Sequence, residues 1–309
     1  MKLFFKRKKR KLKSALLTHY FNAGNRLSRR RLHGSGQHRI VSMTTHAPRV
    51  RDVHIALESL MAQRFRDFDL HLYISRHDMA QIERLPETLE RLIARGLKVC
   101  VTEQDYRSYD KLVHALVRYP NACIITVDDD VIYPRRWLNG LLETSARHPG
   151  CIVCYRGHFL SETAPGSRHI SYSASRSDSR PGVSGPDLCL MPTGNSGVLY
   201  PPQSLDPIAL DSDAFQGLAP SADDIWFKMA SLKKGTPCVR VGPKNVEFPP
   251  TASARVAPLH KQNVRLGGND RQFMNCLLHY PEMAERLFGP SQAREDASSS
   301  ISGTRRRLS

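Results

Sequence analysis

The chain has 309 residues and a formal charge of +17, from 46 Lys and Arg residues against 29 Asp and Glu residues. The charge is unevenly spread, because residues 1–32 contain 12 of the basic residues and no acidic residue, and the remainder carries 34 basic against 29 acidic residues. This distribution excludes a uniformly basic body of the histone or ribosomal kind. The 40% of apolar residues excludes a protein that is disordered throughout.

Hydropathy and cysteine content indicate the cellular compartment. No uninterrupted run of eighteen apolar residues occurs, so we expect no membrane-spanning helix. The basic run at residues 6–11 is followed only by a short apolar run at 15–17, which is too small for the hydrophobic region of a secretory signal. The seven cysteines are odd in number and scattered, which favours reduced thiols over a disulfide framework. We therefore expect a cytoplasmic protein.

Residues 1–37 are predicted to form a basic amphipathic arm. Apolar residues recur at helical spacing and would form a stripe on a helix whose other face is Lys and Arg. These residues are Leu12, Leu16, Leu17, Tyr20 and Phe21. Such a helix suits an anionic membrane surface, where each basic side chain contributes on the order of 1 kcal/mol. We predict that residues 1–32 bind the inner face of the cell membrane. A solvated tail is the alternative, and nucleic-acid binding is the least favoured interpretation.

From residue 38 onward, apolar runs alternate with segments of helical periodicity. Strands are predicted at 39–45, 70–74, 97–101 and 122–127, and helices at 50–61, 82–93, 109–119, 221–235 and 270–288. Repeated strand–helix units predict right-handed crossovers and a mostly parallel α/β sheet with helices on both faces. We expect a single catalytic domain over residues 38–290, followed by a mobile Ser- and Arg-rich tail at 291–309.

An acidic triplet, Asp128, Asp129 and Asp130, directly follows the fourth predicted strand. In sheets of this kind the ligand binds at the carboxyl ends of the strands. Three adjacent carboxylates repel one another and lose hydration there, so a cation should offset them. A hard divalent metal that also holds a phosphate-bearing substrate meets this need. The alternative, a helix N-cap in an acidic turn, would use only one of the three.

A second acidic pair, Asp223 and Asp224, begins a predicted helix for which Ser221 is the expected N-cap. The helix dipole favours carboxylates in the first turn, and from there they can project into a cleft. A carboxylate in that position can deprotonate an acceptor hydroxyl. Ordinary acidity at a helix start is the alternative. Between the two acidic segments lies a glycine-bearing turn that includes Gly197 and matches neither the dinucleotide nor the P-loop fingerprint.

Together these segments resemble nucleotide-sugar-dependent glycosyltransferases of the GT-A type, as found among bacterial polysaccharide and lipopolysaccharide enzymes. The resemblance covers roughly residues 38–288 and is most specific at Val-Asp-Asp-Asp-Val-Ile-Tyr-Pro, residues 127–134, and Ala-Asp-Asp-Ile-Trp, residues 222–226. Segments 42–49, 108–112, 197–202 and 269–273 add to it by their order and spacing.

The resemblance implies a GT-A-like, Rossmann-type fold and a hexosyltransferase-like activity toward a glycan or lipid-linked acceptor. It also implies roles for individual residues. Thr44, Thr45 and Arg49 would help to hold the nucleotide, and Lys111 would lie near the base or phosphates. Asp128 would face the ribose or sugar and, with Asp130, bind Mn²⁺ or Mg²⁺ through a DxD motif, and Asp129 would assist either function.

The resemblance further implies that Gly197 shapes the wall of the sugar and acceptor cleft. Asp224 or Asp223 would be the general base, and a base opposite the leaving group gives inversion at the anomeric carbon. His260, downstream of these motifs, could also return to the metal, although a surface or core histidine is the default interpretation.

Two other functions stay open at the level of sequence. A metal-dependent nucleotidyltransferase could use a similar sheet, but it would need a Gly-rich, basic phosphate loop after the first strand, where residues 44–49 stand instead. A non-enzymatic protein that binds membranes or nucleic acid through its basic arm would leave the acidic triplet unexplained.

Overall fold

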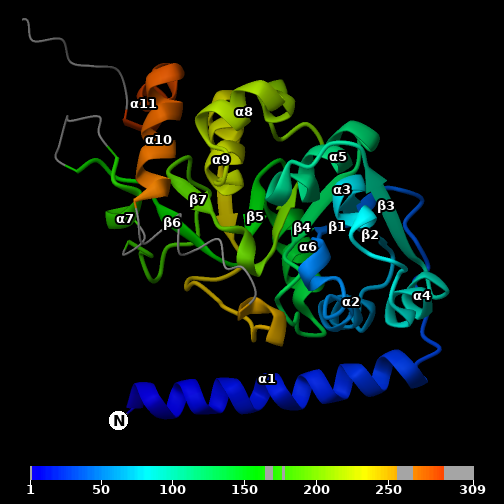
Figure 1. Cartoon of the computed structure of the whole chain (residues 1–309). Coiled ribbons are helices and arrows are strands. Elements are labelled where there is room, and N and C mark those ends of the chain that lie inside the picture. The colour runs from blue at the N-terminus through cyan, green and yellow to red at the C-terminus, as the bar shows by residue number, and fades with distance from the viewer. Residues whose placement is uncertain (1, 164–169, 176–177, 256–266, 289–309) are drawn as a thin grey trace, which may run out of the picture.

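The computed structural model describes residues 2–163, 170–175, 178–255 and 267–288. A seven-stranded sheet in the order β3-β2-β1-β4-β8-β5-β9 forms its centre (Figure 1). The strands are β1 (Arg39–Thr44), β2 (Asp69–Ser75), β3 (Leu97–Thr102), β4 (Cys123–Val127), β5 (Ile152–Cys154), β8 (Val198–Tyr200) and β9 (Cys238–Arg240). A separate pair joins β6 (Gly157–Phe159) and β7 (Leu190–Pro192).

The sheet is mostly parallel, as the sequence predicted. Strands β1 to β4 pair in parallel, and β5 and β9 do the same. β8 runs antiparallel to both β4 and β5 and thereby joins the two parallel parts. The four predicted strands agree with β1 to β4 to within one or two residues. The antiparallel insertion of β8 was not anticipated, because strand direction depends on the path of the chain and not on local composition.

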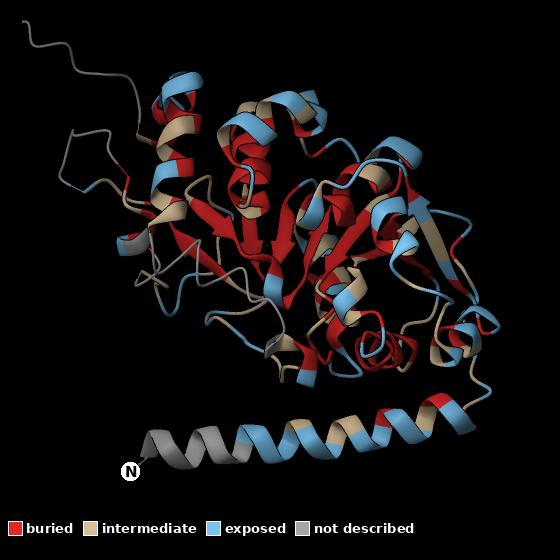
Figure 2. Cartoon of the chain, in the orientation of Figure 1, coloured by how far each residue is buried: buried red, intermediate tan, exposed pale blue. Residues whose placement is uncertain are grey.

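Apolar side chains alternate along the strands and feed two cores, one on each face of the sheet. Ile40 and Ile124 belong to the core beneath α5, α9, α10 and α11, whereas Val41 and Ile125 belong to the core beneath α2, α4 and α6. Because side chains on a strand point alternately to opposite faces, consecutive apolar residues bury both faces. Figure 2 shows the strands as a nearly continuous buried layer between the two sets of helices.

The helices are α1 (Lys2–Leu27), α2 (His54–Met61), α3 (Arg76–Ala80), α4 (Glu87–Ile93), α5 (Asp110–Arg118), α6 (Trp137–Arg147), α7 (Tyr172–Ser175), α8 (Ser212–Leu218), α9 (Asp223–Lys234), α10 (Gly268–His279) and α11 (Glu282–Phe288). Short 3₁₀ turns are η1 (Ala47–Arg49), η2 (Arg107–Tyr109), η3 (Gly194–Ser196), η4 (Pro207–Leu210) and η5 (Ala252–Arg255).

Several helix boundaries differ from the prediction for local reasons. The helix expected at 82–93 begins only after Pro86, and the helix expected at 270–288 divides into α10 and α11 around Pro281, because proline lacks the amide proton that a helix interior needs. Ser221 does not cap α9. The N-cap position is Ala222, and the Ser221 amide donates instead to Oε1 of Gln272 at 2.9 Å.

The N-terminal helix α1 lies across the domain and packs on it through one side only (Figure 1). Phe21 is buried against Ile55 and Ile132, with Leu17 partly buried beside them. The predicted apolar stripe is therefore divided, because its other members, Leu12, Leu16 and Tyr20, are each 62% exposed. Among the described residues, no helix combines the length and apolar character that crossing a bilayer requires.

Candidate active site

The acidic triplet follows β4 at the carboxyl edge of the parallel strands, beside the segment that follows β1. Thr45 donates its hydroxyl to Oδ2 of Asp129 at 2.7 Å. Nη1 of Arg49 donates to Oδ1 of Asp129 at 2.6 Å and to Oδ2 of Asp130 at 3.2 Å. Adjacent parallel strands end at the same edge of a sheet, which is why residues 80 to 84 positions apart meet here. The structure thus brings two of the predicted nucleotide-binding residues to the triplet.

Lys111, near the start of α5, joins the two acidic segments. Its Nζ lies 2.9 Å from Oδ1 of Asp128 and 3.0 Å from Oδ2 of Asp223. The lysine side chain is only 8% exposed. Burial alone would lower the pKa of Lys111, but the carboxylates of Asp128, Asp223 and Asp224 outweigh it and raise the pKa well above its usual value. Lys111 is therefore a permanent cation at the centre of the site.

Gly194, in the turn before β8, lies between the two acidic segments and was missed by the sequence analysis. Its amide donates to both carboxylate oxygens of Asp224, at 3.0 and 3.1 Å. A Cβ at this position would lie 3.0 Å from Nζ of Lys111 and 3.1 Å from Oδ1 of Asp224. Only glycine leaves this space free while its backbone approaches the carboxylates. Gly194 stands in the same glycine turn as Gly197, but spacing alone does not distinguish the two.

Two predicted site residues lie apart from this group. Gly197 has a φ of +90°, and a Cβ there would lie 2.4 Å from Cζ2 of Trp137, so this glycine faces the indole ring instead of the carboxylates. The Trp137 Nε1–H donates to the backbone oxygen of Ser196 at 2.9 Å and fixes the turn. Thr44 donates its hydroxyl to the carbonyl of Tyr73 at 3.2 Å.

Negative charge is in excess in the assembled site. Five carboxylates, those of Asp128, Asp129, Asp130, Asp223 and Asp224, surround two cations of the chain, Arg49 and Lys111. Burial and the charges of Asp128 and Asp129 raise the pKa of Asp130 to about 6. Burial and the neighbouring charge of Asp223 raise the pKa of Asp224 to about 7. In both cases neighbouring carboxylates favour the protonated form, so the site would also stabilise one further cation.

The donor set suits a hard divalent cation that shares its coordination sphere with a substrate. In the described part of the chain, no three His, Cys, Asp or Glu side chains are grouped as a ready-made metal site. Mg²⁺ in phosphate-binding sites commonly takes only one or two carboxylates and completes its shell with phosphates and water. Asp130, whose side chain is 25% exposed, and Asp128, at 27%, are the accessible acids of the triplet. His260 lies outside the described residues.

No protein-family model matches the chain, and no curated protein sequence matches it. Solved structures do share its overall shape, at low identity. The mannosyltransferase PcManGT from Pyrobaculum calidifontis, in complex with GDP-Man and Mn²⁺, is 13% identical over 81% of this chain and 72% of that chain, with a TM-score of 0.43. Glucosyl-3-phosphoglycerate synthase from Mycobacterium tuberculosis, with Mn²⁺ and UDP, is 16% identical over 83% of this chain and 82% of that chain, with a TM-score of 0.42.

A third similar structure is a CMP:2-keto-3-deoxy-manno-octonic acid synthetase complexed with CTP, which is 12% identical over 75% of this chain and 99% of that chain, with a TM-score of 0.40. Two glycosyltransferases and a CTP-bound synthetase are thus among the structures that this chain resembles, at TM-scores of 0.40 to 0.43.

Proposed function

We propose that this protein is a metal-dependent, inverting glycosyltransferase that moves a sugar from a nucleotide-sugar donor to a glycan or lipid-linked acceptor in cell-surface polysaccharide or lipopolysaccharide synthesis. One observation carries the proposal. Two acidic segments, 95 residues apart in the chain, converge on Lys111 and Gly194, the first at the carboxyl end of β4 and the second at the start of α9. Sugar transfer needs these two functions side by side, a place for a diphosphate and a base for the acceptor.

The triplet end of the site supports binding of the donor diphosphate. Asp128 and Asp130 would hold Mn²⁺ or Mg²⁺, which when bound neutralises the charge that develops on the departing nucleoside diphosphate. Arg49 fixes Asp129 and Asp130 from the β1 side, and Thr45 fixes Asp129. These contacts hold the carboxylates in place before the donor arrives, which removes an ordering cost from binding.

The α9 end of the site supports a general base, and Asp224 suits that role better than Asp223. Asp223 is paired with the Lys111 ammonium at 3.0 Å, so its carboxylate is already engaged within the protein. Asp224 has no cation within ion-pairing distance in the described residues, and burial together with Asp223 raises its pKa to about 7. A base is most effective when its pKa lies near the working pH. The two Gly194 contacts orient the Asp224 carboxylate.

The products of the reaction test the proposal. With Mn²⁺ and a panel of nucleotide sugars, we expect release of nucleoside diphosphate and retention of the sugar on an acceptor extract. Asp130→Ala should lower transfer by at least ~100-fold, as expected when electrostatic stabilisation of a transition state is lost. Asp213→Ala, at an exposed acid on α8, is the matched control. Full activity of Asp130→Ala with Mn²⁺ present would contradict the metal role.

A parallel assay, with nucleoside triphosphates and sugar or sugar-phosphate acceptors in place of nucleotide sugars, tests the rival reaction. A nucleotidyltransferase would release pyrophosphate from a nucleoside triphosphate and would not form nucleoside diphosphate from a nucleotide sugar. Pyrophosphate as the sole product would replace the proposed function with this alternative.

We also propose that the protein lies on the inner face of the cell membrane through α1. Its outward side presents Leu12, Leu16 and Tyr20 among basic residues, the composition of a helix that lies on an anionic bilayer. Co-sedimentation with anionic vesicles should weaken steeply with salt and should fall in a Leu12→Ser/Leu16→Ser variant. Leu210→Ser/Leu278→Ser, also exposed, is the matched control. Equal binding by both variants would contradict this surface.

A further inference from the structure

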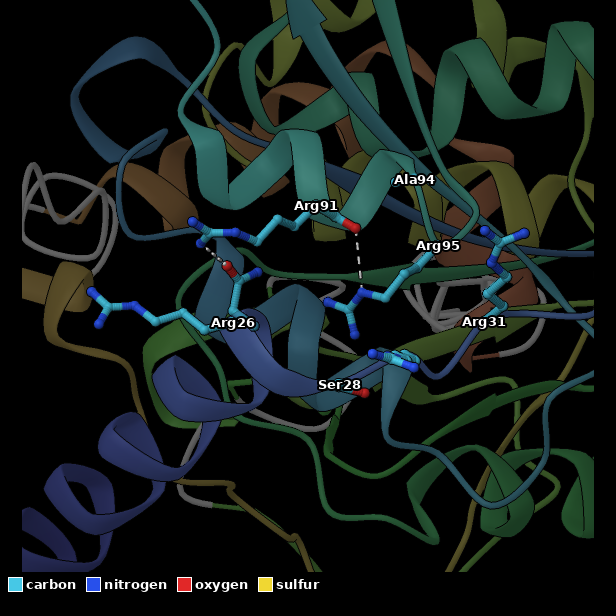
Figure 3. A pocket seen from close by; sticks show the side chains of 8 residues that line it. Arg26, Ser28, Arg31, Arg91, Ala94 and Arg95 are labelled. Carbon is cyan, nitrogen blue, oxygen red and sulfur yellow. Dashed lines mark hydrogen bonds between the residues drawn. The ribbon is translucent and has the colours of Figure 1, made fainter.

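A second charged site lies at the opposite end of the sheet from the acidic cluster. The end of α1 and the segment that follows it meet the end of α4, just before β3 begins at Leu97. An open cavity of about 450 Å³ lies between them. It is lined by Asn25, Arg26, Ser28, Arg29, Arg31, Arg91, Ala94 and Arg95. Figure 3 shows Arg91 of α4 and Arg95, which follows that helix, above Arg26 and Ser28, with Arg31 at the right. Five of the eight lining residues are arginines, and none is acidic.

Arg91 of α4 and Arg95, just after this helix, are already compensated by the protein. Arg95 is buried and forms an ion pair with Glu58, and its Nε donates to the Arg91 carbonyl at 3.3 Å. Arg91 pairs with Glu87 and donates to Oδ1 of Asn25 at 3.1 Å. Both side chains are therefore held in place on one side of the cavity, and Glu87 and Glu58 balance their positive charges.

The three arginines contributed by α1 and the following segment have no such compensation. Within the described part of the chain, Arg26, Arg29 and Arg31 form no ion pair with any carboxylate. The C-terminal dipole of α1 favours Arg26 but weakens beyond the last turn, so it does not account for the two arginines that follow. Three guanidinium groups therefore surround one cavity without a counter-ion from the protein.

The backbone holds Arg29 and Arg31 in place although their side chains are exposed. Nη2 of Arg30 donates to the carbonyl of Gln63 at 2.6 Å, and the amide of Leu32 donates to the carbonyl of Arg95 at 3.1 Å. Arg30 and Leu32 are anchored in this way, whereas Arg31, which lies between them, and Arg29, which precedes Arg30, are exposed. The site is therefore a preorganised cluster and not a flexible basic tail, which lowers the ordering cost of binding an anion.

We propose that this cavity binds a phosphoryl group, either a phosphate monoester or a diphosphate. Guanidinium groups bind phosphate through paired, charge-assisted hydrogen bonds, and clustered arginines match a group that carries more than one negative charge. Leu27, between Arg26 and Ser28 in the sequence, is 79% exposed, so the segment that lines the cavity also offers an apolar side chain to an acyl chain. A lipid headgroup and a free polyphosphate share this chemistry. The site does not depend on the proposed transfer reaction.

The test compares Arg29→Ser/Arg31→Ser with Arg84→Ser/Arg118→Ser, two exposed arginines elsewhere that make no ion pair within the described residues. Calorimetric titration with inorganic pyrophosphate in EDTA probes the free ligand. Phosphatidylcholine vesicles that contain phosphatidic acid or phosphatidylglycerol, adjusted to equal surface charge, probe the headgroup. The first variant should lose at least ~10-fold in affinity for pyrophosphate, or lose a preference for phosphatidic acid, whereas the control should keep both.

Loss of pyrophosphate binding alone identifies a free polyphosphate, and loss of the phosphatidic-acid preference alone identifies a lipid headgroup. Arg29→Lys/Arg31→Lys, which keeps the charge but not the paired donors, should give an intermediate loss, and circular dichroism should show an unchanged fold. Equal behaviour of the Arg29→Ser/Arg31→Ser variant and its control on both probes would overturn the proposal. So would a defect confined to duplex DNA or RNA. Asp130→Ala should bind both probes normally, which separates this site from the proposed reaction.

Discussion

The raised pKa of Asp224 predicts that this residue lowers the stability of the folded protein above acidic pH. In the unfolded chain the carboxyl ionises at its ordinary value of 3.8, and in the folded protein at about 7. A carboxyl with a raised folded pKa favours folding only while protonated, so its contribution is lost as pH rises from the first value to the second. One pKa unit corresponds to about 1.36 kcal/mol. Relative to the protonated state of Asp224, ionisation therefore lowers the free energy of unfolding by about 4 kcal/mol at pH 8 and by about 2 kcal/mol at pH 5.

Asp224→Asn removes this ionisation and keeps one oxygen to accept from the Gly194 amide. Denaturant unfolding in EDTA should therefore show that the variant is more stable than the wild type, with an advantage about 2–3 kcal/mol larger at pH 8 than at pH 5. Asp213→Asn, at an exposed site on α8, should change stability by less than about 0.5 kcal/mol at either pH. An advantage that is absent or independent of pH would refute a titration of Asp224 near neutrality.

Three further predictions concern the same site. Lys111→Met leaves the buried Asp223 and the partly buried Asp128 without their cation. It should therefore lower the unfolding free energy at pH 7 by about 3 kcal/mol, and an undiminished denaturation midpoint would contradict the central role of Lys111. Gly197→Ala should lower the free energy of unfolding by about 3 kcal/mol or more, because backbone strain adds to a clash with Trp137. The control, Gly150→Ala, has a φ of +79° with open space around it and should lower the free energy of unfolding by about 1 kcal/mol. Equal losses in the two variants would exclude the clash. If Asp224 is the base, kcat/KM for transfer by the wild type should rise as the pH passes about 7. Asp224→Asn should lack this rise, and the same pH profile in both proteins would assign the base to another residue.

Much of the fold could be predicted from the sequence because it is encoded locally. Each of the first four strands is a short apolar run, and the segments that form α2, α4 and α5 show a 3.6-residue repeat. Their approximate positions and the parallel arrangement therefore follow from pattern and chain handedness, whereas the five-residue α3 carries no such repeat. The errors occur where tertiary contacts replace local preference. Ser221 has the chemistry of an N-cap, but its amide and hydroxyl contact Gln272 of α10 instead.

Part of the candidate site could also be predicted from local sequence pattern. The acidic triplet could be placed because it directly follows a buried strand, and Thr45 and Arg49 because they follow its neighbour. Gly194 could not be distinguished from Gly197, since both lie in one turn and differ only in backbone conformation and in what a Cβ would meet. Sequence spacing does not contain that information.

The sequence by itself determined that a cluster of aspartates exists and that a cation must offset it, because like charges at a strand end repel one another whatever surrounds them. Only the tertiary structure decided that part of this cation is Lys111, which α5 carries between two acidic segments distant in the chain. The sequence likewise determined that the arm is basic and amphipathic. Packing against α2 and α4 decided which residues of α1 are buried and which stay exposed, because docking fixes one side of a helix that its composition leaves free to rotate. It also decided where Arg26 and the two arginines that follow the helix line a cavity.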